Sequence, residues 1–363
     1  MFTAFRRDQN HMIFLPAERV YPPVDTTPID ANSAYCRLWL RNMRLSRRFD
    51  WFHRYYPVVH AATSFYYGRQ VVKIPSLAGP LLLTNLTQNN LDQVIICNHH
   101  LTPLFPFKGG DIELEAGLFS MATNDHVKGF VTAVERIAKL IPVPEFSAVL
   151  NLIPAVYAAI EDLMDVGGSQ LQIGYLERFV SAGSGVVNQL RGGYFAAILD
   201  EQGTLDRDKL CVVDGKLMVG PKGMQGEFRD NPHALERCSY MLFELEKRPN
   251  LGGEVDMLPT IGMLRTEARE ATLLGDSKKA REIFSQLISA IARSNDLLES
   301  EQRRLALSVK DELNRLPLQA LQATTLRSLA AIMSQEAEPP LDAETEAALA
   351  EWRQFYQAID DMR

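Results

Sequence analysis

The sequence predicts an α+β protein: a β-rich, sandwich-like N-terminal region with a two-helix insertion, followed by a C-terminal antiparallel helical region. β-branched and aromatic residues concentrate in short runs over residues 11–125 and 169–248. Helical spacing of apolar residues interrupts these runs at about 126–165, and helix-favouring Ala, Leu, Glu, Arg and Gln dominate after about residue 259. We therefore expect a β-rich domain over residues 1–250 and a helical domain over 255–363.

The expected strands are runs of β-branched and aromatic residues closed by Gly, Pro, Asn or Asp. Residues 35–45 alternate apolar and polar side chains, which is typical of a strand with one solvated face. Residues 57–67 and 71–74 flank Gly68-Arg69 and predict a hairpin. A second hairpin is expected around Asp214-Gly215, a pair that suits a two-residue type I′ turn. Further strands are expected at residues 91–104, 111–122, 171–180, 194–199, 210–213, 216–219 and 240–246.

Two helices are expected in the insertion and several in the C-terminal region. In the insertion, apolar residues from Val127 to Ile141 follow helical spacing, prolines then interrupt it, and the spacing resumes from Phe146 to Leu163. In the C-terminal region, Gly275-Asp276 separates a helix over about 260–274 from the next one. Residues 273–291 (LLGDSKKAREIFSQLISAI) are similar to one helical pair of a tetratricopeptide repeat. No second copy follows at a period of about 34 residues, so no family is assigned.

Composition and charge exclude several classes of protein. With 46% hydrophobic and 23% charged residues in 363, the chain lies in the globular range, which excludes collagen-like and wholly disordered proteins. The net charge of −7 argues against binding a polyanion by bulk charge. The four cysteines are far apart, and we find no secretory signal and no apolar stretch of about 20 residues that would span a membrane. We therefore expect a reduced, cytoplasmic protein without a transmembrane segment.

The sequence offers one weak metal or nucleophile candidate, Cys97 with His99. On a strand these two side chains share a face, whereas His100 lies on the opposite face. Further ligands would have to come from elsewhere, with His53, His60 and His126 as the available imidazoles. The structural alternative is a buried cysteine beside a histidine that bonds a backbone carbonyl. No phosphate-binding loop, H-E-x-x-H motif or nucleophile elbow accompanies the pair, so we expect no cofactor and assign no catalytic residue.

An arginine-rich and aromatic segment is the candidate partner-binding site. Residues 37–54 carry a net charge of +5. Arginine beside aromatic rings suits nucleic acids, phosphorylated ligands and acidic protein surfaces. The alternative is that these arginines pair with acidic helices of the same protein, because residues 1–110 have a charge of +6 and the remainder −13. On a straight strand Arg37 and Arg41 share one face and Arg44 lies on the other. The candidate residues are Arg37, Arg41, Arg44, Arg47, Arg48, Trp51 and Arg54.

These observations predict a non-catalytic interaction protein, an adaptor or regulatory subunit. A protein partner would dock on the helical region or on the arginine and aromatic segment. One alternative is an enzyme, a metal-dependent or thiol-dependent hydrolase that uses Cys97 and His99. Another is a nucleic-acid-binding protein that uses the arginine and aromatic segment. Binding to a membrane surface is not expected.

Overall fold

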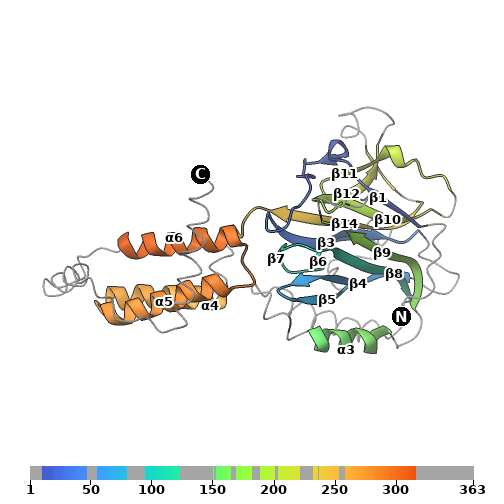
Figure 1. Cartoon of the computed structure of the whole chain (residues 1–363). Coiled ribbons are helices and arrows are strands. Elements are labelled where there is room, and N and C mark those ends of the chain that lie inside the picture. Colours follow the sequence, from blue (N-terminus) through green and yellow to red (C-terminus); the bar gives the residue numbers. More distant parts are fainter. Residues whose placement is uncertain are drawn as a thin grey trace. The chain divides into compact units, whose positions relative to one another are not determined.

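The computed structural model confirms the α+β class (Figure 1). It describes residues 10–46, 55–79, 95–122, 150, 153–164, 169–181, 189–200, 203–220, 232–235, 237–252 and 258–315. The chain divides into two compact units, residues 1–249 and 250–363. The first helix expected in the insertion, residues 127–141, and everything after residue 315 lie outside the described residues.

Three sheets are stacked in the first unit, and the central one is antiparallel (Figure 1). Its strands, in spatial order, are β1 (Asn10–Phe14), β10 (Gly193–Leu199), β14 (Ser239–Arg248), β3 (Tyr35–Arg44) and β6 (Ile95–His100), and the short β7 (Phe105–Pro106) also pairs with β3. All seven residues of β10 are buried, because other sheets cover both faces of this central sheet.

The outer sheet packs on one face of the central sheet as a β-sandwich. Its strands, in spatial order, are β5 (Gln70–Ala78), β4 (Tyr55–Tyr67), β8 (Ile112–Ala122) and β9 (Ser169–Phe179). Alternate residues of β4, such as Val59 and Ala61, join Leu38 and Leu40 of β3 in the core between the two sheets. The other face of the outer sheet carries α3 (Ile153–Met164), which packs against β5. This helix coincides with the C-terminal part of the second helix expected in the insertion and ends one residue beyond Leu163.

A small sheet covers the other face of the central sheet and forms a second core with it. Its strands, in spatial order, are β13 (His233–Ala234), β12 (Lys216–Val219), β11 (Leu210–Val213) and β2 (Val20–Tyr21). Leu210 and Leu217 of this sheet pack with Tyr240 and Leu242 of β14. The central sheet therefore contributes to two hydrophobic cores.

Both hairpins expected from the sequence are present. β4 pairs with β5 up to Tyr67 opposite Gln70, and β11 pairs with β12 around Asp214-Gly215. The φ angles of Asp214 and Gly215 are 49° and 72°, as a type I′ turn requires. The strand expected over residues 91–104 is shorter: β6 ends at His100, after Asn98 with its positive φ of 41°. Residues 91–94 lie outside the described residues.

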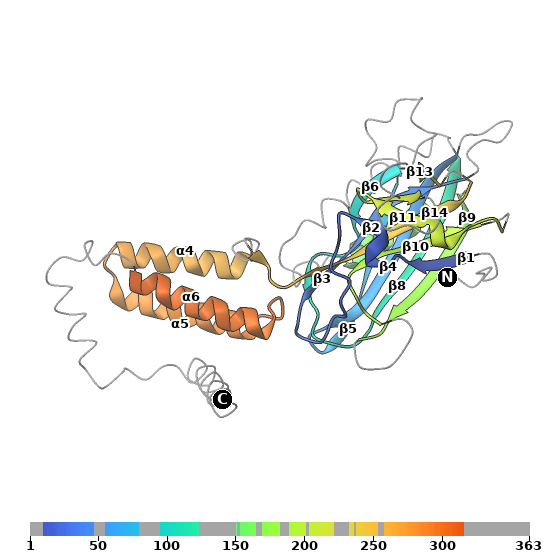
Figure 2. The same ribbon diagram turned by 90° about the horizontal axis from the view of Figure 1, so that it is seen from above.

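The described helices of the second unit are α4 (Pro259–Leu273), α5 (Ser277–Arg293) and α6 (Glu299–Arg315) (Figure 2). The Asp276 side chain accepts a hydrogen bond from the Lys279 backbone N–H and caps α5, which confirms the start expected there. Its apolar stripe is buried through Leu287 and Ile291. In the described part of the chain, every helix is too short or too polar to cross a membrane.

Candidate functional site

Two of the predicted partner-binding arginines, Arg37 and Arg41, lie on β3 and are paired within the protein. The Arg41 Nε atom is 2.6 Å from the Glu244 Oε2 atom, and an Arg37 Nη1 atom is 3.8 Å from Glu246 Oε2. The two arginine side chains are only 19% and 14% exposed. Both glutamates come from the neighbouring strand β14 and not from the acidic helices that the charge distribution indicated.

An aromatic side chain completes this cluster on β3 and β14. The Trp39 indole N–H donates to Glu246, with a distance of 2.7 Å. The Arg41 guanidinium lies 4.0 Å from the centre of the Trp39 ring, and His100 of β6 meets the same ring edge-on at 3.9 Å. Cation–π contacts and charge-assisted hydrogen bonds thus hold these side chains in place.

The expected position of Arg44 on the opposite face of β3 is wrong. The pairing of β3 with β14 shifts register, because Leu40 is opposite Phe243 and Asn42 is opposite Leu242. Arg41 is therefore the extra residue of a β-bulge. Beyond the bulge the alternation changes phase, and Arg44 lies opposite Tyr240, on the same face as Glu244 and the small sheet. The remaining candidates Arg47, Arg48, Trp51 and Arg54 lie outside the described residues.

The structure places His99 and His60 on opposite sides of the outer sheet. His99 is opposite Leu40, which faces the core between the central and outer sheets. His60 lies on the other face of the outer sheet, because its neighbours Val59 and Ala61 face that core. The outer sheet thus separates the two imidazoles. Burial lowers the pKa of each of them to about 4.

The proposed Cys97 and His99 site stays a prediction. The Nε2 atom of His99 is buried without a hydrogen-bond partner in the described part of the chain. The side chain of Cys97 lies outside the described residues, as do His53 and His126. Within the residues that the structure describes, no three His, Cys, Asp or Glu side chains form a group that could hold a metal ion.

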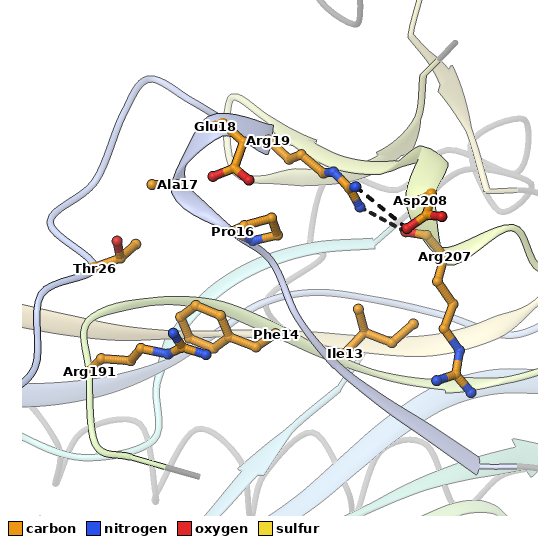
Figure 3. A pocket seen from close by; sticks show the side chains of 10 residues that line it. All are labelled: Ile13, Phe14, Pro16, Ala17, Glu18, Arg19, Thr26, Arg191, Arg207 and Asp208. Atoms are coloured by element: carbon orange, nitrogen blue, oxygen red, sulfur yellow. Dashed lines mark hydrogen bonds and ion pairs between the residues drawn. The ribbon is translucent and has the colours of Figure 1, made fainter. Parts of the chain in front are cut away.

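A groove of about 480 Å³ on the first unit gathers arginines from three separate segments (Figure 3). One wall is β1 with the short helix η2 (Ala17–Arg19) that follows it, and another is the short helix η5 (Arg207–Lys209). Arg191, which precedes β10, closes the groove together with Thr26. The lining residues are Ile13, Phe14, Pro16, Ala17, Glu18, Arg19, Thr26, Arg191, Arg207 and Asp208.

The arginines of the groove differ in their contacts. Arg19 forms an ion pair with Asp208 at 3.6 Å and donates to the Arg207 backbone carbonyl at 3.2 Å (Figure 3). The Arg191 guanidinium lies against the Phe14 ring, 3.8 Å from its centre. No carboxylate of a described residue pairs with Arg191. The donors of Arg191 are thus available to an anionic ligand.

Two glycines position Arg191 in the groove wall. A Cβ atom on Gly192 would lie 2.3 Å from the Asp25 carbonyl oxygen, and Gly193 has a φ of 120° with Phe14 and Thr26 beside it. The Asp25 loop is held against the central sheet by an ion pair of 3.0 Å to Lys247. Hydrogen bonds from Thr27 and the contact with Lys247 lower the pKa of Asp25 to about 2. Only glycine allows this close approach of two backbone segments.

Sequence reasoning missed this groove. Its lining residues are spread from Ile13 to Asp208, and their contact depends on the strand order of the central sheet. The signal that was present is Arg191-Gly192-Gly193 directly before a strand, since paired glycines indicate a close backbone approach.

No protein-family model, curated protein or solved structure matches this chain. The groove and the β3–β14 cluster therefore have to be interpreted from their own geometry.

Proposed function

We propose that the chain is a non-catalytic protein-binding protein, an adaptor or regulatory subunit, whose partner docks on the groove of the first unit. The observation that supports this proposal is the Arg191 guanidinium, which lies over the Phe14 ring and has no carboxylate partner among the described residues. Arginine beside an aromatic ring in a concave surface is typical of the few residues that carry most of the binding energy in protein interfaces.

The lining of the groove also favours a protein ligand. Apolar side chains such as Ile13 and Pro16 line the groove together with charged ones such as Glu18 and Arg19. A peptide carries both apolar and charged groups, so it can match such a mixed surface. The contacts of Asp25 and Gly192 hold the loop beside the groove in place, which lowers the entropy cost of binding.

The two alternatives have less support. Nucleic-acid binding through β3 would have to break the pairs of Arg37 and Arg41 with β14 before either guanidinium could reach a phosphate. Hydrolysis by Cys97 and His99 depends on a side chain outside the described residues. Both stay hypotheses.

Affinity capture from an extract of the native cell tests the proposal with three forms of the full chain. These are the wild type, Arg191→Gln, and Arg69→Gln as a matched control, since Arg69 is exposed in the β4–β5 turn and does not line the groove. We expect the same stoichiometric partner with the wild type and Arg69→Gln, and its loss with Arg191→Gln. A lone monomer on a sizing column with no captured partner would contradict the proposal. Retention of the partner by Arg191→Gln would place docking elsewhere, such as on the helical unit.

A further inference from the structure

We infer that the groove binds an acidic, extended segment of the partner, in which a carboxylate meets Arg191 and a neighbouring apolar side chain contacts the apolar lining. This inference rests on the proposed function and names the chemistry of the partner. Three features of the groove carry it: the charge balance of its arginines and acids, the contact of Arg191 with Phe14, and the presence of both charged and apolar side chains in the lining.

The charge balance of the groove favours a carboxylate. Three arginines and two acids line it. Asp208 forms an ion pair with Arg19, so these two charges largely cancel. Of the other charges, Glu18 has no described ion pair, Arg207 has a further contact of its own, and Arg191 has no carboxylate partner among the described residues, so the lining has a net charge of +1. A single carboxylate near Arg191 gains one charge-assisted pair and meets little repulsion from the rest of the groove.

The same balance disfavours phosphates. A phosphate group carries up to two negative charges, and a nucleic acid repeats its charge at every nucleotide. Such a ligand would bring several negative charges close to Glu18, the lining acid without a described ion pair. The apolar side chains of Ile13, Pro16 and Ala17 would find no apolar counterpart on a phosphate backbone.

The geometry of Arg191 favours two parallel hydrogen bonds to one carboxylate. Its guanidinium lies over the Phe14 ring, 3.8 Å from the ring centre, and this contact limits its rotation (Figure 3). Because a guanidinium donates from adjacent N–H groups in one plane, an oriented arginine can bind both oxygens of a carboxylate. A lysine at this position would keep the charge but lose the paired donors of the guanidinium.

An extended segment suits the remaining lining. In an extended peptide alternate side chains point to the same side, and adjacent ones point to opposite sides. A carboxylate and an apolar residue near it in the sequence can therefore reach the Arg191 end and the Pro16–Ala17 wall of the groove together.

The test measures fluorescence anisotropy of labelled peptides with the full chain. The probe is an eight-residue peptide that carries one glutamate, with a valine on either side of it and uncharged polar residues elsewhere. The comparison ligands are the same peptide with glutamine for glutamate, a phosphoserine peptide of equal net charge, and an eight-nucleotide oligothymidylate. We expect only the glutamate peptide to bind well, and its affinity to fall as salt rises.

Variants locate the binding. Arg191→Lys should weaken binding of the glutamate peptide about tenfold, and Arg191→Gln by more, as expected for loss of a charge-assisted hydrogen bond. Glu18→Gln should tighten it up to about fivefold, because one repelling surface charge is removed. Arg69→Gln should leave it unchanged. Circular dichroism and urea unfolding of each variant show whether it folds.

Three outcomes would overturn the inference: no binding of the glutamate peptide to the wild type, equal binding to a folded Arg191→Gln, or tighter binding of the phosphoserine peptide or oligothymidylate. If the captured partner depends on Arg191 but the glutamate peptide does not bind, the inference fails and the proposed function stands. If the peptide binds with the expected variant effects but no partner is captured, the proposed function fails and the ligand chemistry of the groove stands.

Discussion

Acid should destabilise the first unit through His99. This side chain is 7% exposed and lies in the core between the central and outer sheets. Burial lowers its pKa from 6.5 to about 4. Between these values the unfolded chain binds a proton that the folded chain does not, so the free energy of unfolding falls as the pH falls from 6.5 to 4.

The size of this effect follows from the difference in pKa. At about 1.36 kcal/mol per pH unit, a pKa lowered from 6.5 to about 4 corresponds to about 3 kcal/mol of stability that is present at pH 7 and lost near pH 4. His60 has a similarly lowered pKa and adds to the slope in the same direction. A loss of about 3 kcal/mol is a large part of the stability of an ordinary domain, which is about 5–15 kcal/mol.

Urea unfolding at a series of pH values from 7.5 to 4.5 measures the effect. In a Trp352→Phe background, the remaining tryptophans, Trp39 and Trp51, both belong to the first unit. The perturbation is His99→Phe, which keeps a ring of similar size and removes the titrating group. Its Nε2 atom has no described hydrogen-bond partner, so the variant should be at least as stable as the wild type at pH 7.

The expected result is a flatter pH dependence in His99→Phe, with a slope smaller by up to about 1.4 kcal/mol per pH unit within the window. A proton NMR titration of the imidazole signals reports the pKa of His99 directly. Parallel pH profiles of the wild type and His99→Phe, or a His99 pKa near 6.5, would refute the reasoning.

Three further predictions follow from the packing. Gly192→Ala should lower stability by about 1–3 kcal/mol in urea unfolding, because its Cβ would lie 2.3 Å from the Asp25 carbonyl oxygen; an unchanged midpoint would show that the loop moves freely. In the full chain, Leu287→Ala, at a fully buried position of α5, should lower the free energy of unfolding of the second unit by about 2–5 kcal/mol, measured by urea unfolding. A loss below about 1 kcal/mol would contradict the place of Leu287 in the core. A double-mutant cycle of Arg41→Ala and Glu244→Ala should give a favourable coupling of about 1 kcal/mol or more, whereas additive effects would mean that the pair contributes nothing.

Much of the local structure could be predicted from the sequence. The turn at Asp214-Gly215 needs positive φ at adjacent residues, and the cap of α5 needs an acceptor three residues before Lys279. Both depend on residues that are close in the chain. The alternation on β3 was also predicted, but only as far as its bulge at Arg41.

The candidate site was predicted less well. The position of Arg44 was wrong because an extra residue at Arg41 changes which side chains share a face, and this extra residue is visible only in the pairing with β14. The partners of Arg37 and Arg41 are more than 200 residues away in the chain, on a strand that could not be placed beside β3 from its sequence.

By itself, the sequence determined the α+β class, the two hairpins and the helical C-terminal region, since these depend on residue preferences and on contacts between near neighbours. Only the tertiary structure decided that Phe14, Arg191 and Asp208 line one groove. It also decided that Arg41 forms an ion pair with Glu244. The physical reason is that strand order and register join segments far apart in the chain, and one bulge is enough to move a charge to the other face of a sheet.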